Sequence, residues 1–392
     1  MKLSIEQVEL EGRRVFLRAD LNAPLEHSAV SDDTRLTAVL PTIRLALERG
    51  AAVVLASHLG RPKGGPDPKY SLAPVAERLT ALLERPVTLA PDCVGDAVER
   101  MAGDLKPGQV LLLENLRFHR EEEANDDGFA RRLAALGNVY VNDAFAAAHR
   151  AHASIAAITR HLQPAAAGLL MRRELEALGR ILESPARPLA AVLGGAKVSD
   201  KLTLVEHLLA RVDALIIGGG MAFTFLRALG HGVGKFLVEV DRIDTARSAM
   251  ETARRRGVQI VLPVDAVVAA GFDSPAGRAV SVRDIPAEQM GLDIGPLTVE
   301  HFAAALRTAK TIVWNGPMGV FEKPAFAAGT VAVARAVAES GAFSVIGGGD
   351  TVAAVNQAGV AARIGYISTA GGAFLEFLEG RTLPGVEALT EA

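Results

Sequence analysis

The sequence predicts an α/β protein with two Rossmann-like lobes, each built on a mostly parallel sheet, joined by a helix and a hinge. Short apolar runs alternate with longer helical patterns along the whole chain. The residues that follow these runs are charged in the first half and are glycines in the second half. A helical segment that ends at prolines lies between the halves. The apolar runs are residues 14–18, 51–56, 109–113, 138–141, 189–193, 214–218, 259–263, 311–314, 343–346 and 365–368.

The composition is that of a chain long enough for two domains. It has 392 residues, 49% of them hydrophobic, and a net charge of −3. A weakly acidic chain without a long apolar stretch is not typical of nucleic-acid or membrane binding, so we expect neither partner. The single cysteine, Cys93, excludes an intramolecular disulfide, and the N-terminal residues lack the apolar segment of a signal peptide. We expect a cytoplasmic monomer that acts on small molecules.

The residues after the strands of the first half predict an anion site. Ligands of open parallel sheets bind beyond the carboxyl ends of the strands. Arginine and histidine side chains suit a small, highly charged anion because of their charge and, for arginine, its fork of donors. Arginines that converge from separate loops repel one another unless an anion lies between them. We expect such convergence of Arg35, Arg61, Arg117 and Arg150.

The glycines of the second half predict a nucleotide site, because they allow backbone N–H groups to approach phosphates closely. In "VIGGGDT", a lone Asp350 would repel phosphate unless a cation bridged them, which favours a Mg²⁺ ligand. A plain helix N-cap is the alternative. Lys197 and Lys201 would share one face of a helix that began near Lys197, although two surface lysines would also explain them. We interpret "MGLDIGP" and "WNGPMGVFE" as loops that shape a flat slot.

The predicted division of the chain places the acid-substrate domain at residues 1–168. A connecting helix follows at residues 169–184, where leucines recur at helical spacing before Pro185 and Pro188. A surface helix of a single domain is the alternative. The nucleotide domain then covers residues 185–392, and we expect its last residues to pack back on the first lobe.

Nine motifs, in order along the chain, closely resemble the 3-phosphoglycerate kinase family. They are "RADLNAPL…SDDTRL", "ASHLGRPKG", "LLLENLRFHREEE", "AHRAHAS", "LGGAKVSDK", "IGGGMAFTFL", "MGLDIGP", "TIVWNGPMGVFE" and "GGGDTVAA". The resemblance implies a two-lobed, hinge-bending kinase that uses Mg²⁺ with ATP or ADP and binds 3-phosphoglycerate in the other lobe.

The resemblance also implies the roles of particular residues. The acid substrate would be bound by Asp20, Leu21, Asn22, Arg35, His58, Leu59, Gly60, Arg61, Arg117 and Arg150. The nucleotide would be bound by Lys197, Lys201, Gly218, Gly219, Gly291, Asn315, Pro317, Glu322, Gly348, Gly349, Asp350 and Thr351. The catalytic residues would be Arg35, Lys197, Gly371 and Gly372, with Asp350 as the Mg²⁺ ligand.

For several of these residues the pattern alone leaves a simpler explanation open. Asp20 and Asn22 could be turn residues, and Arg35 could be a solvated arginine beside Asp32 and Asp33. Glu322 could be an acid in the first turn of a helix. We assign no catalytic role to the three histidines His119, His149 and His152.

The sequence departs from the family pattern at two places. Ala146 and Ala147 stand in "AAAHR", where the pattern has "GTAHR". Ala370 and Phe374 stand in "STAGGAF", where it has "STGGGAS". We expect these changes to affect the rate and not the class of reaction.

The resemblance implies transfer of a phosphoryl group between 1,3-bisphosphoglycerate and ADP, which gives 3-phosphoglycerate and ATP in glycolysis. The acceptor carboxylate is already ionised, so the reaction needs positioning and charge stabilisation and no general base. An acetate- or aspartate-type kinase is an alternative, but its acceptor would not need four arginines. A non-catalytic binder is another, but it would not need both Lys197 and Asp350.

Overall fold

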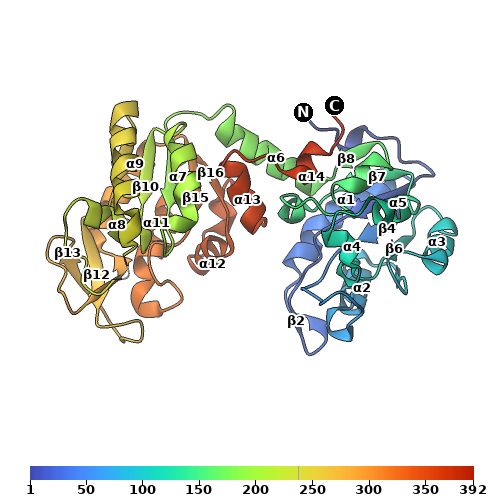
Figure 1. Cartoon of the computed structure of the whole chain (residues 1–392), viewed down its shortest axis with the longest axis horizontal. Coiled ribbons are helices and arrows are strands. Elements are labelled where there is room, and N and C mark those ends of the chain that lie inside the picture. Colours follow the sequence, from blue (N-terminus) through green and yellow to red (C-terminus); the bar gives the residue numbers. More distant parts are fainter. Residues whose placement is uncertain (237) are drawn as a thin grey trace. The chain divides into compact units, whose positions relative to one another are not determined.

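The computed structural model describes residues 1–236 and 238–392 and divides into two units. Unit 1 comprises residues 1–176 and 382–392, and unit 2 comprises residues 177–381. The division falls inside helix α6 (Leu169–Leu182). Each unit contains one six-stranded parallel sheet with helices packed around it (Figure 1). The expected α/β class with two parallel-sheet lobes is confirmed.

The sheet of unit 1 has the strand order β5-β6-β4-β1-β7-β8. Its central strands are continuous apolar runs because both faces of the sheet are covered. The strands are β1 (Arg14–Arg18), β4 (Ala52–Ala56), β5 (Val87–Leu89), β6 (Val110–Leu112), β7 (Val139–Asn142) and β8 (Ala165–Ala167), with a separate hairpin of β2 (Leu25–Glu26) and β3 (Ala29–Val30). The helices are α1 (Thr34–Glu48), α2 (Ala73–Leu83), α3 (Asp96–Gly103), α4 (Arg120–Glu123), α5 (Asp127–Ala134) and α14 (Pro384–Glu387).

The sheet of unit 2 has the order β11-β10-β9-β15-β16-β17. Its core includes Trp314, the only tryptophan of the chain, which is fully buried. The strands are β9 (Leu189–Leu193), β10 (Ala214–Ile217), β11 (Gln259–Val261), β15 (Thr311–Asn315), β16 (Phe343–Ile346) and β17 (Tyr366–Ile367). The helices are α7 (Leu202–Leu209), α8 (Met221–Ala228), α9 (Ile243–Arg256), α10 (Pro296–Thr308), α11 (Ala328–Glu339), α12 (Gly349–Gln357) and α13 (Gly371–Leu378).

Unit 2 also contains a small antiparallel sheet that the sequence did not predict. Its order is β13 (Arg278–Ser281), β12 (Asp265–Ala269) and β14 (Met290–Ile294). The interpretation of "MGLDIGP" as a loop is therefore wrong, because residues 290–294 form β14. Glycine and aspartate are uncommon in strands, which hid the pattern. Gly291 is required there because a Cβ at this position would collide with the ring of Phe223.

The two ends of the chain lie side by side in unit 1 (Figure 1). Lys2 and Glu391 form an antiparallel bridge, and the backbone N–H of Thr390 donates to the carbonyl of Ala165 at 2.9 Å. Leu383 and Leu389 are buried. The C-terminal residues are thus part of the core of unit 1. Among the described residues, no helix combines the length and the apolar character needed to cross a bilayer.

Deleting residues 382–392 should destabilise unit 1 selectively. Leu383 and Leu389 are buried, so their loss should lower the free energy of unfolding by roughly 3–6 kcal/mol. We expect a lower thermal midpoint by far-UV circular dichroism, while the fluorescence transition of Trp314, which reports on unit 2, stays in place. Deleting only the exposed Glu391 and Ala392 is the control. An equal shift of the fluorescence transition would contradict this assignment.

Candidate functional site

The carboxyl ends of four neighbouring strands in unit 1 gather the predicted anion-binding segments at one edge of the sheet. The strands β6, β4, β1 and β7 are adjacent and parallel. Residues 20–22 follow β1, residues 58–61 follow β4, Arg117 follows β6 and Arg150 follows β7. The topology therefore brings segments that are far apart in the sequence to one place.

The segment Asp20–Asn22 connects two of these loops. The carboxylate of Asp20 accepts a hydrogen bond from Arg35 Nη1 at 2.8 Å, and it also accepts the backbone N–H of Asn22 at 3.2 Å. The side-chain oxygen of Asn22 accepts the N–H of Gly60 at 2.8 Å. Asp20 and Asn22 therefore make contacts within the protein, and these contacts leave a binding role open. Leu21 is buried, and its N–H donates to Ser57 Oγ at 2.9 Å.

Arg35 differs from its predicted setting. We expected four arginines on four loops, but Arg35 lies in the first turn of helix α1. It is not simply a solvated neighbour of Asp32 and Asp33, because it pairs with Asp20 and Asp33 pairs with Arg78. The helix therefore fixes the backbone of Arg35, while Asp20 orients its guanidinium group.

The other three arginines differ in exposure. Arg117 is buried in the 3-10 helix Leu116–Phe118, where its Nη1 donates to the carbonyl of Gly60 at 2.8 Å and its Nε lies 3.2 Å from a carboxylate oxygen of Glu123. Arg61 is exposed, and none of the described residues forms an ion pair with it. Arg150 is half-buried. Gly60 has a φ of +60° and packs against the ring of Tyr70, which leaves no room for a Cβ.

Arg18 is a cation of this site that the sequence reasoning missed. It ends β1 and is 1% exposed. Its Nε donates to Ser154 Oγ at 2.9 Å, and its Nη2 lies 3.2 Å from His58 Nδ1. The buried carboxylate of Glu122 accepts from Ser154 Oγ at 2.5 Å. A basic residue that ends an otherwise apolar strand is a signal that could have found it.

Two histidines of the site, His58 and His152, are neutral because of burial and the nearby arginines. Burial lowers the pKa of His58 well below its usual value, and Arg18, Arg117 and Arg150 lower it further. Burial and the same arginines lower the pKa of His152 to about 3. The positive charge of the cluster therefore resides on the arginines. Such a concentration of cations favours a multiply charged anion.

In unit 2 the glycines again follow adjacent strands at one sheet edge, but many of their N–H groups are already used. The N–H groups of Gly194, Gly195, Gly218 and Gly219 each donate to a backbone carbonyl. These glycines allow the loops after β9, β10 and β15 to pack on one another. The N–H groups of these four glycines are therefore used within the protein, where they hold the loops together.

The N-terminus of α12 does present free donors. Gly348 is the N-cap residue, with a φ of +95°, and Gly349 and Asp350 occupy the first turn. The first N–H groups of a helix have no acceptor within it. The alternative that Asp350 is an N-cap is wrong, because Gly348 holds that position. Thr351 is buried, and its hydroxyl accepts the N–H of Gly316 at 2.7 Å.

Lys197 and Lys201 do not share a helix face. A 3-10 turn begins at Ser199 and α7 begins at Leu202, so Lys197 lies before both and is exposed. Lys201 Nζ donates to the carbonyl of Gly194 and to the side-chain oxygen of Asn315, each at 2.6 Å. Burial lowers the pKa of Lys201 to about 8, against the opposing effect of Asp200 and Asp350. Lys201 is thus not a plain surface lysine.

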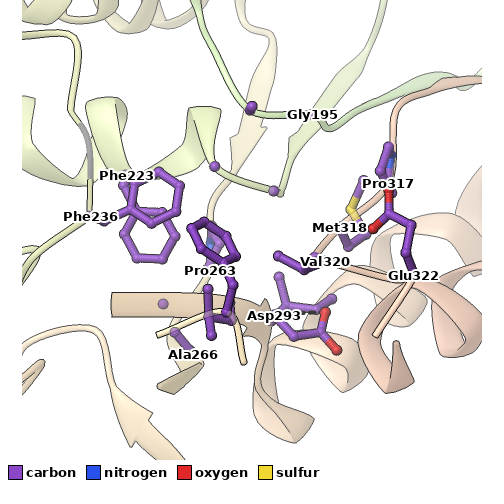
Figure 2. Close-up of a pocket in the computed structure, with 18 of the residues that line it drawn as sticks. Gly195, Phe223, Phe236, Pro263, Ala266, Asp293, Pro317, Met318, Val320 and Glu322 are labelled. Atoms are coloured by element: carbon purple, nitrogen blue, oxygen red, sulfur yellow. Dashed lines mark hydrogen bonds between the residues drawn. The ribbon is translucent and has the colours of Figure 1, made fainter. Parts of the chain in front are cut away.

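A cavity of about 280 Å³ lies between the parallel sheet of unit 2 and its small antiparallel sheet (Figure 2). Of the predicted nucleotide residues, those that line it are Gly219, Gly291, Pro317, Glu322 and Asp350. Those outside its lining are Lys197, Lys201, Gly218, Asn315, Gly348, Gly349 and Thr351. Glu322 lies in an exposed turn and not in a helix, so that alternative is wrong. A cavity of about 280 Å³ is large enough for a heterocyclic ring.

The cavity walls contain residues that the sequence reasoning missed. Phe223 and Phe236 are stacked with their ring centroids 4.5 Å apart and form one wall (Figure 2). Asp293 lies on another wall, and burial raises its pKa to about 7, although the N–H groups of Gly329 and Ile294 bond to it. The stacked rings offer an apolar surface, and Asp293 offers a polar group to a bound ring.

The departures from the family pattern lie in the segments that follow β7 and β17. Ala146 and Ala147 belong to the 3-10 helix Phe145–Ala147. Ala370 is the N-cap residue of α13, and its first residue, Gly371, has open space where a Cβ would be. Phe374 is fully buried, and its ring packs directly on Gly347, at the start of the glycine loop before α12. Phe374 therefore supports the loop before α12 through its contact with Gly347.

The comparisons with known proteins find similarity to phosphoglycerate kinases. The family model described as phosphoglycerate kinase matches residues 5–381. The chain is 57% identical to a phosphoglycerate kinase of Acidobacterium capsulatum, over 100% of this chain and 99% of that protein. It is 53% identical to a chloroplastic phosphoglycerate kinase of Volvox carteri, over 98% of this chain and 85% of that protein. A phosphoglycerate kinase structure from Coxiella burnetii superposes with a TM-score of 0.92 at 43% identity, covering 99% of this chain and 98% of the other.

Proposed function

Because the chain belongs to the phosphoglycerate kinase family, we propose a division of labour between the two units in the reaction of that family. The reaction transfers a phosphoryl group between 1,3-bisphosphoglycerate and ADP, with 3-phosphoglycerate and ATP as products, and it is a step of glycolysis. We assign the acid substrate to the cationic edge of unit 1 and the nucleotide to unit 2. The convergence of Arg18, Arg35, Arg117 and His58 on one sheet edge is the observation that carries this assignment.

In unit 1, the guanidinium groups would hold the phosphate and carboxylate of the acid. Arg61 is free to reach a ligand, while Arg117 and Arg35 are already oriented by Gly60 and Asp20. Asp20 and Asn22 present polar atoms beside them and would contact the hydroxyl side of the acid. Preset donors lose little side-chain entropy when the ligand binds, which favours both affinity and orientation.

In unit 2, the cavity would hold the adenine ring beside Phe223, Phe236 and Gly291. Glu322 would accept hydrogen bonds from ribose hydroxyls. The free N–H groups at the start of α12 would hold the terminal phosphates. Lys201 would add a positive charge from a fixed position, whereas the exposed Lys197 would follow the phosphoryl group as it moves. Gly371 and Gly372, at the start of α13, would offer N–H groups to the same phosphoryl group.

Asp350 is suited to a magnesium ion. Its carboxylate is exposed at the edge of the cavity, and none of the described side chains forms an ion pair with it. Mg²⁺ commonly binds one or two protein carboxylates together with phosphate oxygens. The residues present therefore fit this ion, which when bound would neutralise charge on the nucleotide phosphates. Asp350 would supply the protein ligand and fix the terminal phosphates against α12.

The proposed mechanism needs no proton transfer. The attacking carboxylate of the acid is ionised at neutral pH. Burial and the nearby arginines hold the pKa values of His58 and His152 well below the usual value, so these two side chains stay neutral. The residues of the chain act by binding, orientation and charge stabilisation. We further propose that the protein is a cytoplasmic monomer, as its similarity to bacterial phosphoglycerate kinases favours.

We propose that the two units come together during turnover. The acid would be bound by residues of unit 1 and the nucleotide by residues of unit 2. Transfer requires the reacting atoms to lie about 3–3.5 Å apart. Small-angle X-ray scattering should show a smaller radius of gyration with both ligands than with either one, because the ligands favour a closed form. An identical radius in all samples would argue for a preformed site.

Replacing Arg61 should weaken acid binding without disturbing the fold, because Arg61 is exposed and forms no ion pair with the described residues. In a coupled assay of purified protein, we expect Arg61→Ala to raise KM for 3-phosphoglycerate by roughly tenfold or more, since a charged hydrogen bond contributes about 1.5–3 kcal/mol. The KM for ATP should stay constant. Arg132→Ala, an exposed arginine on α5, is the control. A rise in KM for ATP alone would reverse the assignment of the units.

Lys197 and Lys201 should differ in kinetics and in pH dependence. We expect Lys197→Ala to lower kcat by about 10² because its contact forms in the transition state. Lys201→Ala should mainly weaken nucleotide binding. In the wild type, nucleotide affinity should fall as the pH rises through about 8, where Lys201 loses its proton. The Lys201→Ala variant should lack this fall. A wild-type affinity that is flat from pH 7 to 9 would contradict the role of Lys201.

Asp350→Asn should raise the Mg²⁺ concentration needed for half-maximal activity, because the amide is a weaker ligand than the carboxylate. Its thermal midpoint should match that of the wild type, since Gly348 and not Asp350 caps α12. Asp200→Asn is a matched control, because Asp200 also acts on Lys201 but lies outside the cavity. The same Mg²⁺ requirement in wild type and Asp350→Asn would remove Asp350 from the metal site.

A further inference from the structure

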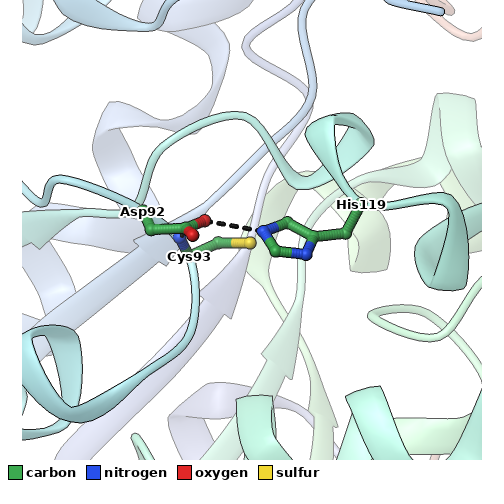
Figure 3. A group of neighbouring side chains, drawn as sticks. All are labelled: Asp92, Cys93 and His119. Atoms are coloured by element: carbon green, nitrogen blue, oxygen red, sulfur yellow. Dashed lines mark hydrogen bonds and ion pairs between the residues drawn. The ribbon is translucent and has the colours of Figure 1, made fainter. Parts of the chain in front are cut away.

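A cluster of three metal-ligand side chains lies in unit 1, apart from the residues assigned to the acid (Figure 3). Asp92 and Cys93 lie in the bend between β5 and α3, and His119 joins the 3-10 helix Leu116–Phe118 to α4. Their ligand atoms all lie within 4.8 Å of one another. Cys93 is the only cysteine of the chain. The proposed function uses none of these three residues.

The three side chains are held in place by their own contacts. His119 Nε2 lies 2.7 Å from Asp92 Oδ1, and the backbone N–H of Cys93 donates to the same oxygen at 2.6 Å. The imidazole of His119 is stacked on the ring of Phe129, with the ring centroids 5.2 Å apart. In Figure 3, the sulfur of Cys93 lies beside the imidazole and the carboxylate. The cluster is therefore ordered without an added ligand, which reduces the entropic cost of binding one.

We propose that Asp92, Cys93 and His119 form a binding site for a divalent cation of the Zn²⁺ type. A thiolate, an imidazole and a carboxylate are the ligands that Zn²⁺ accepts, whereas Mg²⁺ prefers oxygen ligands alone. Metal–ligand bonds of about 2.0–2.3 Å in a tetrahedron separate the ligand atoms by about 3.3–3.6 Å. The Asp92–His119 pair needs only to open slightly from 2.7 Å to reach that separation.

The exposure of the cluster suits a site with three protein ligands and one water. The side chains of Asp92 and His119 are 45% and 24% exposed, whereas Cys93 is buried. A cation would thus lie with the sulfur on its inner side and solvent on its outer side. Three protein ligands with a water in the fourth position are a common zinc arrangement.

Binding would release the thiol proton of Cys93, which is lost to solvent as the sulfur–metal bond forms. His119 would bind the metal through the lone pair of Nε2 and carry a proton on Nδ1. Asp92 exchanges its hydrogen bond to His119 for a bond to the metal. In the absence of a cation, burial and the Asp92 carboxylate raise the pKa of Cys93 well above its usual value, so the thiol stays protonated.

A cation at this site would also restrain the anion site. His119 follows Arg117 by two residues and is the N-cap residue of α4, whose Glu123 pairs with Arg117. Fixing His119 to Asp92 and Cys93 through a metal would hold the start of α4 and thereby the carboxylate that orients Arg117. A bound metal would thus restrict movement of the loop after β6.

Cobalt provides a direct test, because tetrahedral Co²⁺ bound to a thiolate absorbs light in the near ultraviolet and visible regions. The full chain, freed of metal with a chelator, is titrated with Co²⁺ without nucleotide. We expect saturation at one equivalent and loss of the absorption when Zn²⁺, which binds such sites more tightly, is added. The charge-transfer absorption should be absent in Cys93→Ser. His119→Gln should weaken Co²⁺ binding at least about 100-fold.

The variants and controls make each result decisive. Because Cys93 is buried, the folding of Cys93→Ser is checked by circular dichroism, and the half-exposed Asp92→Asn provides a second variant, for which we expect at least about tenfold weaker binding. His161→Gln is the matched control, since His161 pairs with Asp127 at 2.8 Å, as His119 pairs with Asp92, but has no thiol in such a cluster. The proposal is overturned if the folded wild type shows no thiolate absorption, if the absorption persists in Cys93→Ser, or if His161→Gln weakens binding as much as His119→Gln.

Discussion

The buried carboxylate of Glu122 is the interaction on which the cationic edge of unit 1 depends. Arg18 lies in the interior of the unit and would carry an uncompensated charge without it. Glu122 reaches Arg18 through the hydroxyl of Ser154, and its carboxylate also accepts the N–H of Ser154 at 2.9 Å. The same glutamate therefore compensates the charge and fixes the segment that carries Arg150. Burial raises the pKa of Glu122, and Arg18 opposes this increase, so the two charges depend on each other.

The two units present polar groups at their sheet edges in opposite ways. Unit 1 brings permanent charges together and restrains them with a few neutral or acidic groups, so the polar groups at its sheet edge belong to side chains. Unit 2 packs its glycine loops against one another through backbone hydrogen bonds, and the first N–H groups of α12 have no acceptor within that helix. Phe374 strengthens this arrangement, because its ring packs on Gly347 and thereby restricts movement of the loop before α12. The side-chain charges of unit 1 favour a compact, highly charged ligand. The glycine loops of unit 2 favour a long ligand with a flat ring.

The sequence was sufficient for the parallel sheets and for placing the charged segments at one sheet edge of unit 1, because charged residues after apolar runs are a local signal. It was insufficient where a residue acts through distant neighbours. Arg18 looks like the end of a strand, and its burial depends on Ser154 and Glu122, which lie more than a hundred residues further on. The strand β14 was missed because Gly291 and Asp293 disfavour strands, and only Phe223 and the N–H of Gly329 explain their presence. The setting of Lys201 was missed for the same reason, since its partner Asn315 ends β15, more than a hundred residues further on.

The position of the C-terminal residues in unit 1 has a consequence for the order in which the chain can fold during synthesis. Unit 2 is a continuous segment, so it can complete its core once residue 381 has left the ribosome. Unit 1 begins first but lacks Leu383 and Leu389 until the residues after unit 2 have been made. N-terminal domains usually fold first during synthesis, but in this protein the last folding step belongs to the N-terminal unit. The unit that is made first is the one that is finished last, and a ribosome that stalls before residue 382 would release a chain with a complete unit 2 and an incomplete unit 1.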